Sequence, residues 1–331
     1  MELDNSYDVV VIGGGAAGLN GALMPARSRR TVVVIDAGRP RNAPAAAVHG
    51  LLALDGTPPE ELPARGRDQL RGYGGQVVTG EVADACVAED GFTVTLTDGR
   101  TTRGRRLLVT TGLVDVLPDI PGLAEHWGGD VVHCPFCHGW EVRDRPIGVL
   151  ATGPTAVHQA LMFRQLSDDV VLFTHDRPVP TGEDADRLAV HGVPVHPGRI
   201  AGVDSADGHL TAVRFADGTV VPRSVLAVAT RMAARAGFLA GLGLRTVPHP
   251  SGMGDQLVTD GTGATEVAGV YAAGNVTDPM AQVGAAAAAG ALAGARIHGD
   301  LIEADTARML ADLRDPFSPA SEARAAGRSR R

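Results

Sequence analysis

The stretch YDVVVIGGGAAGLNGAL, residues 7–23, contains the pattern that decides the fold class. The apolar run from Asp8 to Ile12 predicts a buried strand, a glycine turn follows it, and a helix is expected from about Ala16. A second apolar run, TVVVIDAG at residues 31–38, predicts another strand. Strand, glycine turn, helix and strand in this order predict a βαβ unit.

The glycines of this unit have the spacing of a dinucleotide-binding turn. In the pattern GxGxxG the first glycine allows a tight turn, the second lets the backbone approach a pyrophosphate, and the third permits close packing of helix on strand. The helix N-terminus presents free N–H groups to phosphates. An acidic residue ends the second strand 21 positions after Gly15, where it can bind ribose hydroxyls. The predicted nucleotide-binding residues of this unit are Gly13, Gly15, Ala16, Ala17, Gly18 and Asp36.

A second strand–turn–helix–strand pattern follows later in the chain. Residues 76–110 alternate apolar and polar side chains and predict antiparallel strands. The Pro/Gly-rich segment LPDIPGL, residues 117–123, marks a domain boundary. Beyond it, a strand at 146–151, a helix at 155–166 and a strand at 169–174 are expected.

Short strands return after about residue 240, and they precede helices expected at 281–298 and 300–313. The polar tail DPFSPASEARAAGRSRR is predicted to be disordered. The predicted fold is therefore α/β, with one nucleotide-binding domain split by the insertion of another. The boundaries we predict are 1–120 and 244–314 for the split domain, 121–243 for the insert and 315–331 for the tail.

Composition restricts the classes of function. A formal net charge of −8 over 331 residues argues against a nucleic-acid partner. No run approaches the length of a membrane span, and the N-terminus lacks the basic region of a signal peptide, so no membrane partner is expected. The three cysteines do not make a disulfide framework, which favours a reducing cytoplasm.

Two of these cysteines lie in HCPFCHGWE, residues 133–141. A zinc site needs four converging ligands, and no second CxxC or HxxxH pair accompanies Cys134 and Cys137. A disulfide across a two-residue loop adds little stability, so a structural staple is also disfavoured. A CxxC dithiol forms a small, reversible disulfide, and redox activity is the favoured interpretation. Cys86 lies in the alternating region and is expected to be a small buried apolar residue.

Two later segments, LLVTTGLVDVLPDIPG and GVYAAGNV, each place a glycine turn at the end of a strand. They resemble the segments that close over FAD in flavoproteins with two dinucleotide-binding domains. That family has aspartate where this chain has Asn275, which keeps hydrogen-bonding capacity without the charge. The start of the next helix would face the flavin and stabilise its anionic reduced form. The resemblance implies FAD as cofactor, with contacts from Thr111, Gly112, Gly274, Asn275, Gln282 and Val283.

Over nearly its whole length the chain resembles the low-molecular-weight thioredoxin reductases, whose inserted pyridine-nucleotide domain begins with a CxxC. The resemblance implies that Cys137 lies nearest the flavin and that Cys134 exchanges with substrate. Those reductases have an aspartate after the CxxC; here His138 stands instead, and an imidazole with a pKa near about 6.5 can take a thiol proton at neutral pH. The alternative for His138 is a hydrogen-bonded loop histidine. His133 and Glu141 are secondary candidates, which can simply orient the loop.

The insert departs from the reductases at the NADPH site. The reductases carry GxGxxA and then an HRR segment that holds the 2′-phosphate, whereas this chain has ATGPTA at 151–156 and Thr174-His175-Asp176. Asp176 repels a phosphate, and Arg177 alone cannot replace a clamping arginine pair. NADPH is therefore not expected to be the electron donor.

A CPFCHG motif combined with a lost NADPH site resembles the FAD-dependent dithiol oxidases, which close disulfides in natural products such as gliotoxin and holomycin. The resemblance implies that Cys134, Cys137, His138 and FAD oxidise a small dithiol, for instance a dithiolopyrrolone, to an intramolecular disulfide while O2 becomes H2O2. It also implies a homodimer, and we expect an insert fixed with its CxxC facing the flavin. An NAD(P)H-dependent disulfide reductase and a non-catalytic flavoprotein or redox sensor are the alternatives.

Overall fold

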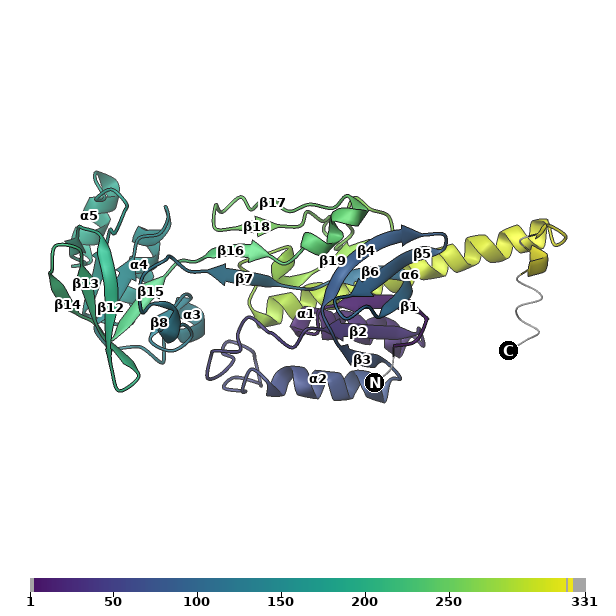
Figure 1. Cartoon of the computed structure of the whole chain (residues 1–331), viewed down its shortest axis with the longest axis horizontal. Coiled ribbons are helices and arrows are strands. Elements are labelled where there is room, and N and C mark those ends of the chain that lie inside the picture. Colours follow the sequence, from purple (N-terminus) through teal and green to yellow (C-terminus); the bar gives the residue numbers. More distant parts are fainter. Residues whose placement is uncertain (1–2, 320, 324–331) are drawn as a thin grey trace.

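The glycine turn at residues 13–15 joins β1 (Ser6–Ile12) to α1 (Ala16–Arg27) in the computed structural model, which describes residues 3–319 and 321–323 (Figure 1). β1 pairs in parallel with β2 (Val32–Asp36), with Val11 opposite Val34. The predicted βαβ unit is confirmed. Its strands are buried on both faces, which explains their nearly continuous valine and isoleucine runs.

The main sheet has the order β3-β2-β1-β6-β5-β4, and β19 pairs with β6 on the same sheet. Only part of the antiparallel prediction for residues 76–110 is correct. β4, β5 and β6 are antiparallel neighbours, whereas β3 pairs in parallel with β2 because α2 returns the chain to the same end of the sheet. The bounds are α2 Glu61–Gly72, β3 Gln76–Thr79, β4 Val82–Ala88, β5 Gly91–Leu96, β6 Thr101–Val109 and β19 Val270–Ala272.

The insert contains its own parallel sheet, in the order β11-β10-β9-β15-β8, and a separate antiparallel sheet of β12, β13 and β14. Figure 1 shows this unit in teal, set apart from the first sheet and joined to it by the paired strands β7 and β16. The elements are β7 Leu113–Val116, η1 Ala124–His126, β8 Val131–Val132, α3 Pro135–His138, β9 Ile147–Leu150, α4 Ala156–Arg164, β10 Val170–Phe173, α5 Glu183–Val190, β11 Val195–His196, β12 Ile200–Ala206, β13 His209–Phe215, β14 Val220–Pro222, β15 Val225–Val228 and β16 Arg231–Ala234.

The return from the insert lies earlier than the predicted residue 243. Ala236, Leu239 and Leu242 are buried in the core of the first unit, and η2 (Gly237–Leu242) packs on β4. Ile120, in contrast, belongs to the core of the insert. The crossing strands β7 and β16 therefore form the connection in both directions. The remaining short elements of the first unit are β17 Val247–Pro248, β18 Asp255–Gln256 and η3 Gly274–Val276.

The C-terminal helix α6 (Val283–Arg314) is one continuous element of 32 residues, so the prediction of two helices is wrong. No proline interrupts the segment, and a glycine inside a helix costs only about 1 kcal/mol. α6 crosses α1 at close range. A Cβ on Gly290 would lie 2.0 Å from the Ala17 carbonyl oxygen, and one on Gly294 would lie 2.1 Å from the Gly21 carbonyl oxygen.

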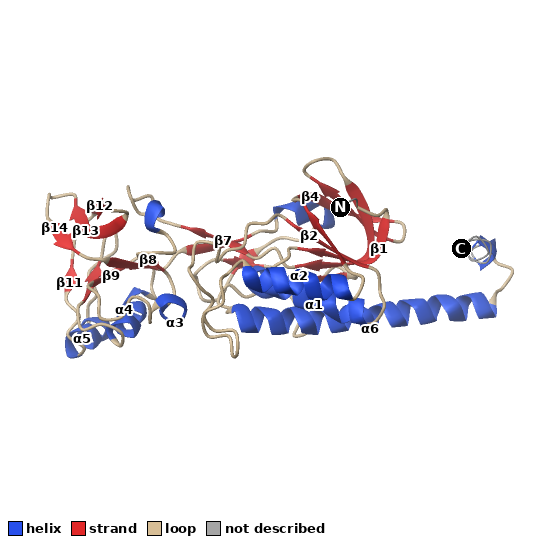
Figure 2. Cartoon of the chain, turned by 90° about the horizontal axis from the view of Figure 1, so that it is seen from below, coloured by secondary structure: helices blue, strands red, loops and turns tan. Residues whose placement is uncertain are grey.

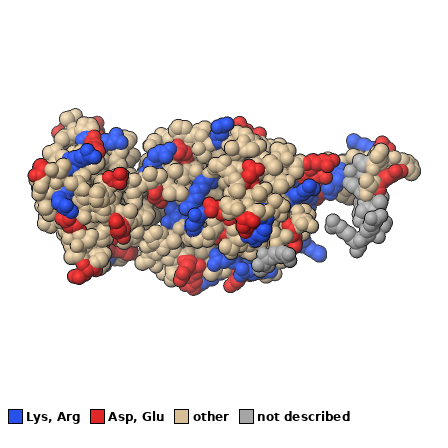
Figure 3. Space-filling view, viewed as in Figure 1, with Lys and Arg blue, Asp and Glu red and all other residues tan. Residues whose placement is uncertain are grey.

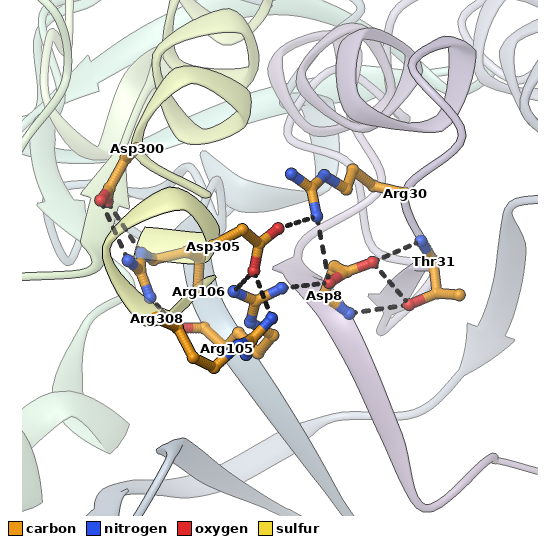
Figure 4. Close-up of polar contacts among 8 residues, drawn as sticks. All are labelled: Asp8, Arg30, Thr31, Arg105, Arg106, Asp300, Asp305 and Arg308. Carbon is orange, nitrogen blue, oxygen red and sulfur yellow. Dashed lines mark hydrogen bonds and ion pairs between the residues drawn. The ribbon is translucent and has the colours of Figure 1, made fainter. Parts of the chain in front are cut away.

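Ion pairs attach the middle of α6 to the sheet (Figure 4). Arg106 donates to both oxygens of Asp300 at 2.8 and 3.0 Å. Asp305 accepts from Arg30 at 2.7 Å and from Arg105 at 2.6 Å. The Arg106 bonds lower the pKa of Asp300; burial acts to raise the pKa of Asp305, but its two arginines outweigh burial and lower it. Beyond these pairs the helix extends away from the sheet (Figure 2).

The described part of the predicted tail makes hydrogen bonds to the end of α6 and to the residue that follows it. The Ser321 hydroxyl contacts the Asp312 carboxylate at 2.9 Å and the Asp315 carbonyl at 2.8 Å. Residues 320 and 324–331 of the predicted tail lie outside the described residues. Within the described ranges, no helix combines the length and the hydropathy needed to cross a bilayer. On the face in Figure 3, arginines and carboxylates are interspersed over both units.

Candidate active site

A cavity of about 1800 Å³ lies where the carboxyl ends of β1 and β6 face the insert. Its walls include the first glycine turn, the loop after β2, the start of α6 and the CxxC segment. The structure thus brings together predicted residues from segments that lie far apart in the sequence. The predicted residues that line the cavity are Gly13, Gly15, Ala16, Ala17, Asp36, Thr111, Gly112, Cys134, Cys137, His138, Asn275, Gln282 and Val283.

Gly18 and Gly274, which were also predicted to be site residues, do not line the cavity but determine how its walls pack. A Cβ on Gly18 would lie 1.9 Å from the Gly13 carbonyl oxygen, as expected for the glycine that allows helix and strand to approach. Gly274 has a φ of +79°, and a Cβ there would lie 2.8 Å from the Ala17 Cβ. Both positions exclude larger side chains for steric reasons.

The glycine turn leaves room for a phosphate group. A Cβ on Gly15 would meet nothing within 4 Å, so the backbone is open to the cavity. Gly13, which has a φ of +106°, packs closely against the Thr110 carbonyl group. Gly14 was missed by the sequence prediction, although it is the middle glycine of the GGG run. A Cβ on Gly14 would lie 2.9 Å from the Asp36 carboxylate carbon, so it must be small for Asp36 to reach the turn.

Asn275 holds the turn that leads into α6. Its Nδ2 donates to the carbonyl oxygens of Asp278 at 3.1 Å and Ala281 at 2.8 Å. A carboxylate cannot donate these bonds, which gives a physical reason for asparagine at this position. Gln282 is the N-cap of α6, so the N-terminus of this helix lies at the cavity wall.

The two cysteines lie at the start of α3, a single helical turn. Cys134 is its N-cap and Pro135 its first residue, and the two Sγ atoms are 2.7 Å apart. The Cys137 thiol donates to Cys134 and, with the backbone N–H groups of Phe136 and Cys137, lowers the pKa of Cys134 to about 7 against the opposing effect of burial. The same bond, followed by burial, raises the pKa of Cys137. The first thiolate therefore forms on Cys134.

His138 ends α3, and neither of its buried ring nitrogens has a hydrogen-bond partner within the described part of the chain. Burial lowers the pKa of His138, and the charge of Glu141 acts in the opposite direction. The ring is therefore neutral at pH 7 and can accept a proton. His133 contacts the Val228 carbonyl through Nδ1 at 3.0 Å, and burial lowers its pKa as well. This contact fits the orienting role considered for His133.

Comparison with known proteins adds the family. The model of the family described as pyridine nucleotide-disulphide oxidoreductase matches residues 7–290. The chain belongs to this family. This oxidoreductase is 35% identical to the thioredoxin reductase tcpT of Claviceps purpurea over 286 residues, which is 83% of this chain and 88% of that protein. It is 32% identical to the thioredoxin reductase sirT of Leptosphaeria maculans over 320 residues, 91% and 96% of the two chains.

Solved structures confirm the predicted fold class. The crystal structure of HlmI superimposes with a TM-score of 0.87 at 44% identity, covering 95% of this chain and 98% of that one. An oxidoreductase from Agrobacterium tumefaciens has a TM-score of 0.84 at 36% identity, covering 90% of this chain and 99% of that one. The oxidoreductase is thus a thioredoxin reductase-like flavoprotein.

FAD is the cofactor of this fold, and the residues of the cavity fit it. The open backbone at Gly15 suits a pyrophosphate, Asp36 can accept hydrogen bonds from ribose hydroxyls, and the α6 N-terminus offers N–H groups and a positive dipole end. The unpartnered ring nitrogens of His138 are a second sign that a polar group belongs in the cavity.

The oxidoreductase also has a polar cluster near the CxxC that no sequence motif indicates. Arg41, on the loop after β2, donates to both oxygens of Asp115 on β7 at 2.6 and 2.7 Å. The Thr230 hydroxyl donates to the same carboxylate at 2.6 Å. Burial acts to raise the pKa of Asp115, but Arg41 outweighs it and the pKa lies below its usual range. Single arginines and aspartates are common in loops, so only the folded chain reveals the pair.

A neighbouring side chain contacts the turn at residues 151–156 of the insert. Arg177 donates to the Thr152 carbonyl oxygen at 2.5 Å, and the Thr152 hydroxyl donates to Ala229 O at 2.5 Å. Asp176 contacts His175 Nε2 at 2.9 Å. Arg177, which lies beside this turn, is therefore bonded to the backbone.

Cys86 differs from its prediction. It is half-buried on β4 rather than buried in the core. Among the described residues, no three His, Cys, Asp or Glu side chains are arranged to hold a metal ion.

Proposed function

We propose that this oxidoreductase is an FAD-dependent oxidase that converts a small dithiol into its intramolecular disulfide while O2 is reduced to H2O2. The substrate loses two electrons and two protons, which the oxidant gains. The chain is a thioredoxin reductase-like disulfide oxidoreductase. What we propose is the direction in which electrons flow through it.

One observation supports this direction: Arg177, beside the insert's nucleotide turn, already donates a hydrogen bond to the Thr152 carbonyl. A dinucleotide phosphate would need the N–H groups of that turn and a free cation, while Asp176, whose side chain is 61% exposed, adds a repelling charge. The CxxC, in contrast, lines the cavity that fits FAD. A dithiol entering this cavity is then the electron donor.

The exchange steps follow from the two cysteines. A substrate thiolate attacks Sγ of Cys134 in the oxidised enzyme, the Cys134–Cys137 bond breaks, and Cys137 leaves as a thiolate. The second substrate thiolate attacks the substrate sulfur of this mixed disulfide, and Cys134 leaves. Once the Cys137 thiolate has taken up a proton, its hydrogen bond lowers the pKa of Cys134 to about 7, and because a thiol of low pKa is the better leaving group, this favours the second step.

His138 takes up the protons that the substrate thiols lose, one at a time, and passes each to a cysteine thiolate that leaves. Its ring is neutral at pH 7, lines the cavity and has two nitrogens free of other partners within the described residues. FAD, when bound, would supply the two-electron chemistry that links the enzyme dithiol to O2. Cys134 thus exchanges with the substrate sulfur, Cys137 passes the electron pair toward the cofactor, and His138 accepts protons.

We further propose a natural-product dithiol, such as a dithiolopyrrolone, as substrate, on the basis of the CPFCHG motif. A cytoplasmic homodimer without nucleic-acid or membrane partners remains part of the proposal.

The test mixes the purified flavoprotein without oxygen with dithiothreitol or with NADPH and follows the flavin absorbance. We expect bleaching by the dithiol alone and one H2O2 per dithiol after air is admitted. Rapid bleaching by NADPH would favour the reductase alternative, which the names of the relatives support. Cys134→Ser should keep the flavin and lose the response to dithiol, whereas the matched control Cys86→Ser should keep both.

A further inference from the structure

The loop between β2 and α2 contacts the connection between the two units. Arg41 of this loop binds Asp115 on β7 through two hydrogen bonds, and Thr230, at the start of the return crossing, binds the same carboxylate. The Asp115 side chain is only 5% exposed. Because a buried carboxylate without its cation is strongly unfavourable, this contact favours one arrangement of the crossing strands.

The same loop contacts the insert itself at two further places. Gly128, with a φ of +85°, lies so close to Pro44 that a Cβ on the glycine would be 2.5 Å from the Pro44 Cβ. His49 Nε2 lies 3.3 Å from the Glu141 carboxylate, three residues beyond His138. In Figures 1 and 2 the loop before α2 extends toward α3 of the insert. Three contacts from one loop thus oppose movement of the insert.

We propose that residues 39–55 form a strap that holds the insert with Cys134 and Cys137 facing the cavity, and so limits exchange to thiols small enough to enter it. Arg41 and His49 are positioning residues in this arrangement. Both cysteines line the cavity and are only partly exposed, so under this proposal a protein thiol reaches them only if the insert moves away. The restriction on dithiol substrates rests on the proposed oxidase function; the holding of the insert does not.

Size-selective alkylation of the reduced holoprotein tests the strap. N-ethylmaleimide and a polyethylene glycol maleimide carry the same reactive group but differ in size, so the ratio of their rates at Cys134 reports access and cancels changes in thiol reactivity. In a Cys86→Ser background, Arg41→Met should raise the large-to-small ratio about tenfold, the effect of about 1.4 kcal/mol on the opening equilibrium. Glu141→Ala, which breaks a separate contact, should raise it in the same direction.

Arg39→Met is the matched control, because Arg39 lies on the same loop but pairs with Glu81 of the first unit at 2.6 Å. Its ratio should equal that of the parent. An unchanged ratio in both Arg41→Met and Glu141→Ala would overturn the strap, as would a parent ratio equal to that of the unfolded protein. If Arg41→Met loses its flavin, Glu141→Ala decides the question. Alkylation needs no turnover, so failure of the strap and failure of the oxidase are distinguishable.

Discussion

Replacing Cys137 by alanine tests the electrostatics of the CxxC most directly. The Cys137 thiol donates the hydrogen bond that contributes most to the low pKa of Cys134. Without it, the pKa of Cys134 should rise from about 7 toward the ordinary thiol value of about 8.5. At pH 7 the thiolate fraction then falls from about one half to about 3%.

The loss in rate is smaller than the loss of thiolate, because a thiolate of higher pKa is more nucleophilic. With a Brønsted coefficient of about 0.45, an increase of about 1.5 in pKa makes each thiolate about fivefold more reactive. The alkylation rate of Cys134 should therefore fall about threefold at pH 7 and rise about fivefold at pH 10. The two pH profiles should cross near about pH 8.

The assay measures the pH dependence of iodoacetamide alkylation at Cys134, by mass spectrometry, in the fully reduced protein with Cys86→Ser and without oxygen. Cys137→Ser is the matched control, because its hydroxyl can still donate and should keep the apparent pKa well below that of the alanine variant. An apparent pKa that stays near 7 or falls in Cys137→Ala would refute the assignment of the first thiolate to this hydrogen bond.

Three further outcomes follow from burial and packing. His138→Asn should lower kcat by about 10²- to 10⁴-fold with flavin content unchanged. In the wild type, the acid limb of the pH profile of turnover should lie below the ordinary imidazole pKa of about 6.5, because burial lowers the pKa of His138. Gly290→Ala forces a methyl group against the Ala17 carbonyl and should lower the free energy of unfolding by about 1–3 kcal/mol. Gly299→Ala, in the same helix but with open space around it, should raise the free energy of unfolding by about 0.5–1 kcal/mol. Chemical denaturation measures both changes. The pKa of Asp305 is lowered in the folded state, so the stability that this carboxylate contributes is present above its unfolded pKa of about 3.9 and is lost as the pH falls. Asp305→Asn should therefore reduce the fall in Tm between about pH 5 and pH 3. An unchanged fall in Tm would contradict this.

Local patterns in the sequence predicted the βαβ unit, the interrupted plan and the redox CxxC. The glycine turn could be interpreted because each glycine answers a short-range steric requirement, as the close contacts of Gly13 and Gly18 show. The helix break predicted between residues 298 and 300 was wrong, because long-range contacts and not local sequence decide whether this helix continues. Gly299 is a weak local signal, and ion pairs of Asp300 with Arg106 on β6 stabilise the continuous helix.

The sequence by itself determined the fold class, the flavin motif and the cysteine pair, because these depend on residues close together in the chain. Only the tertiary structure placed Cys134 and Cys137 against the cavity that fits FAD, since those segments lie about 120 residues from the glycine turn. It also decided the surroundings that set their chemistry: the unpartnered ring of His138, the Arg41–Asp115 pair and the contact of Arg177 with Thr152. Those contacts join residues remote in sequence, and neither their distance nor their burial is encoded in any local pattern.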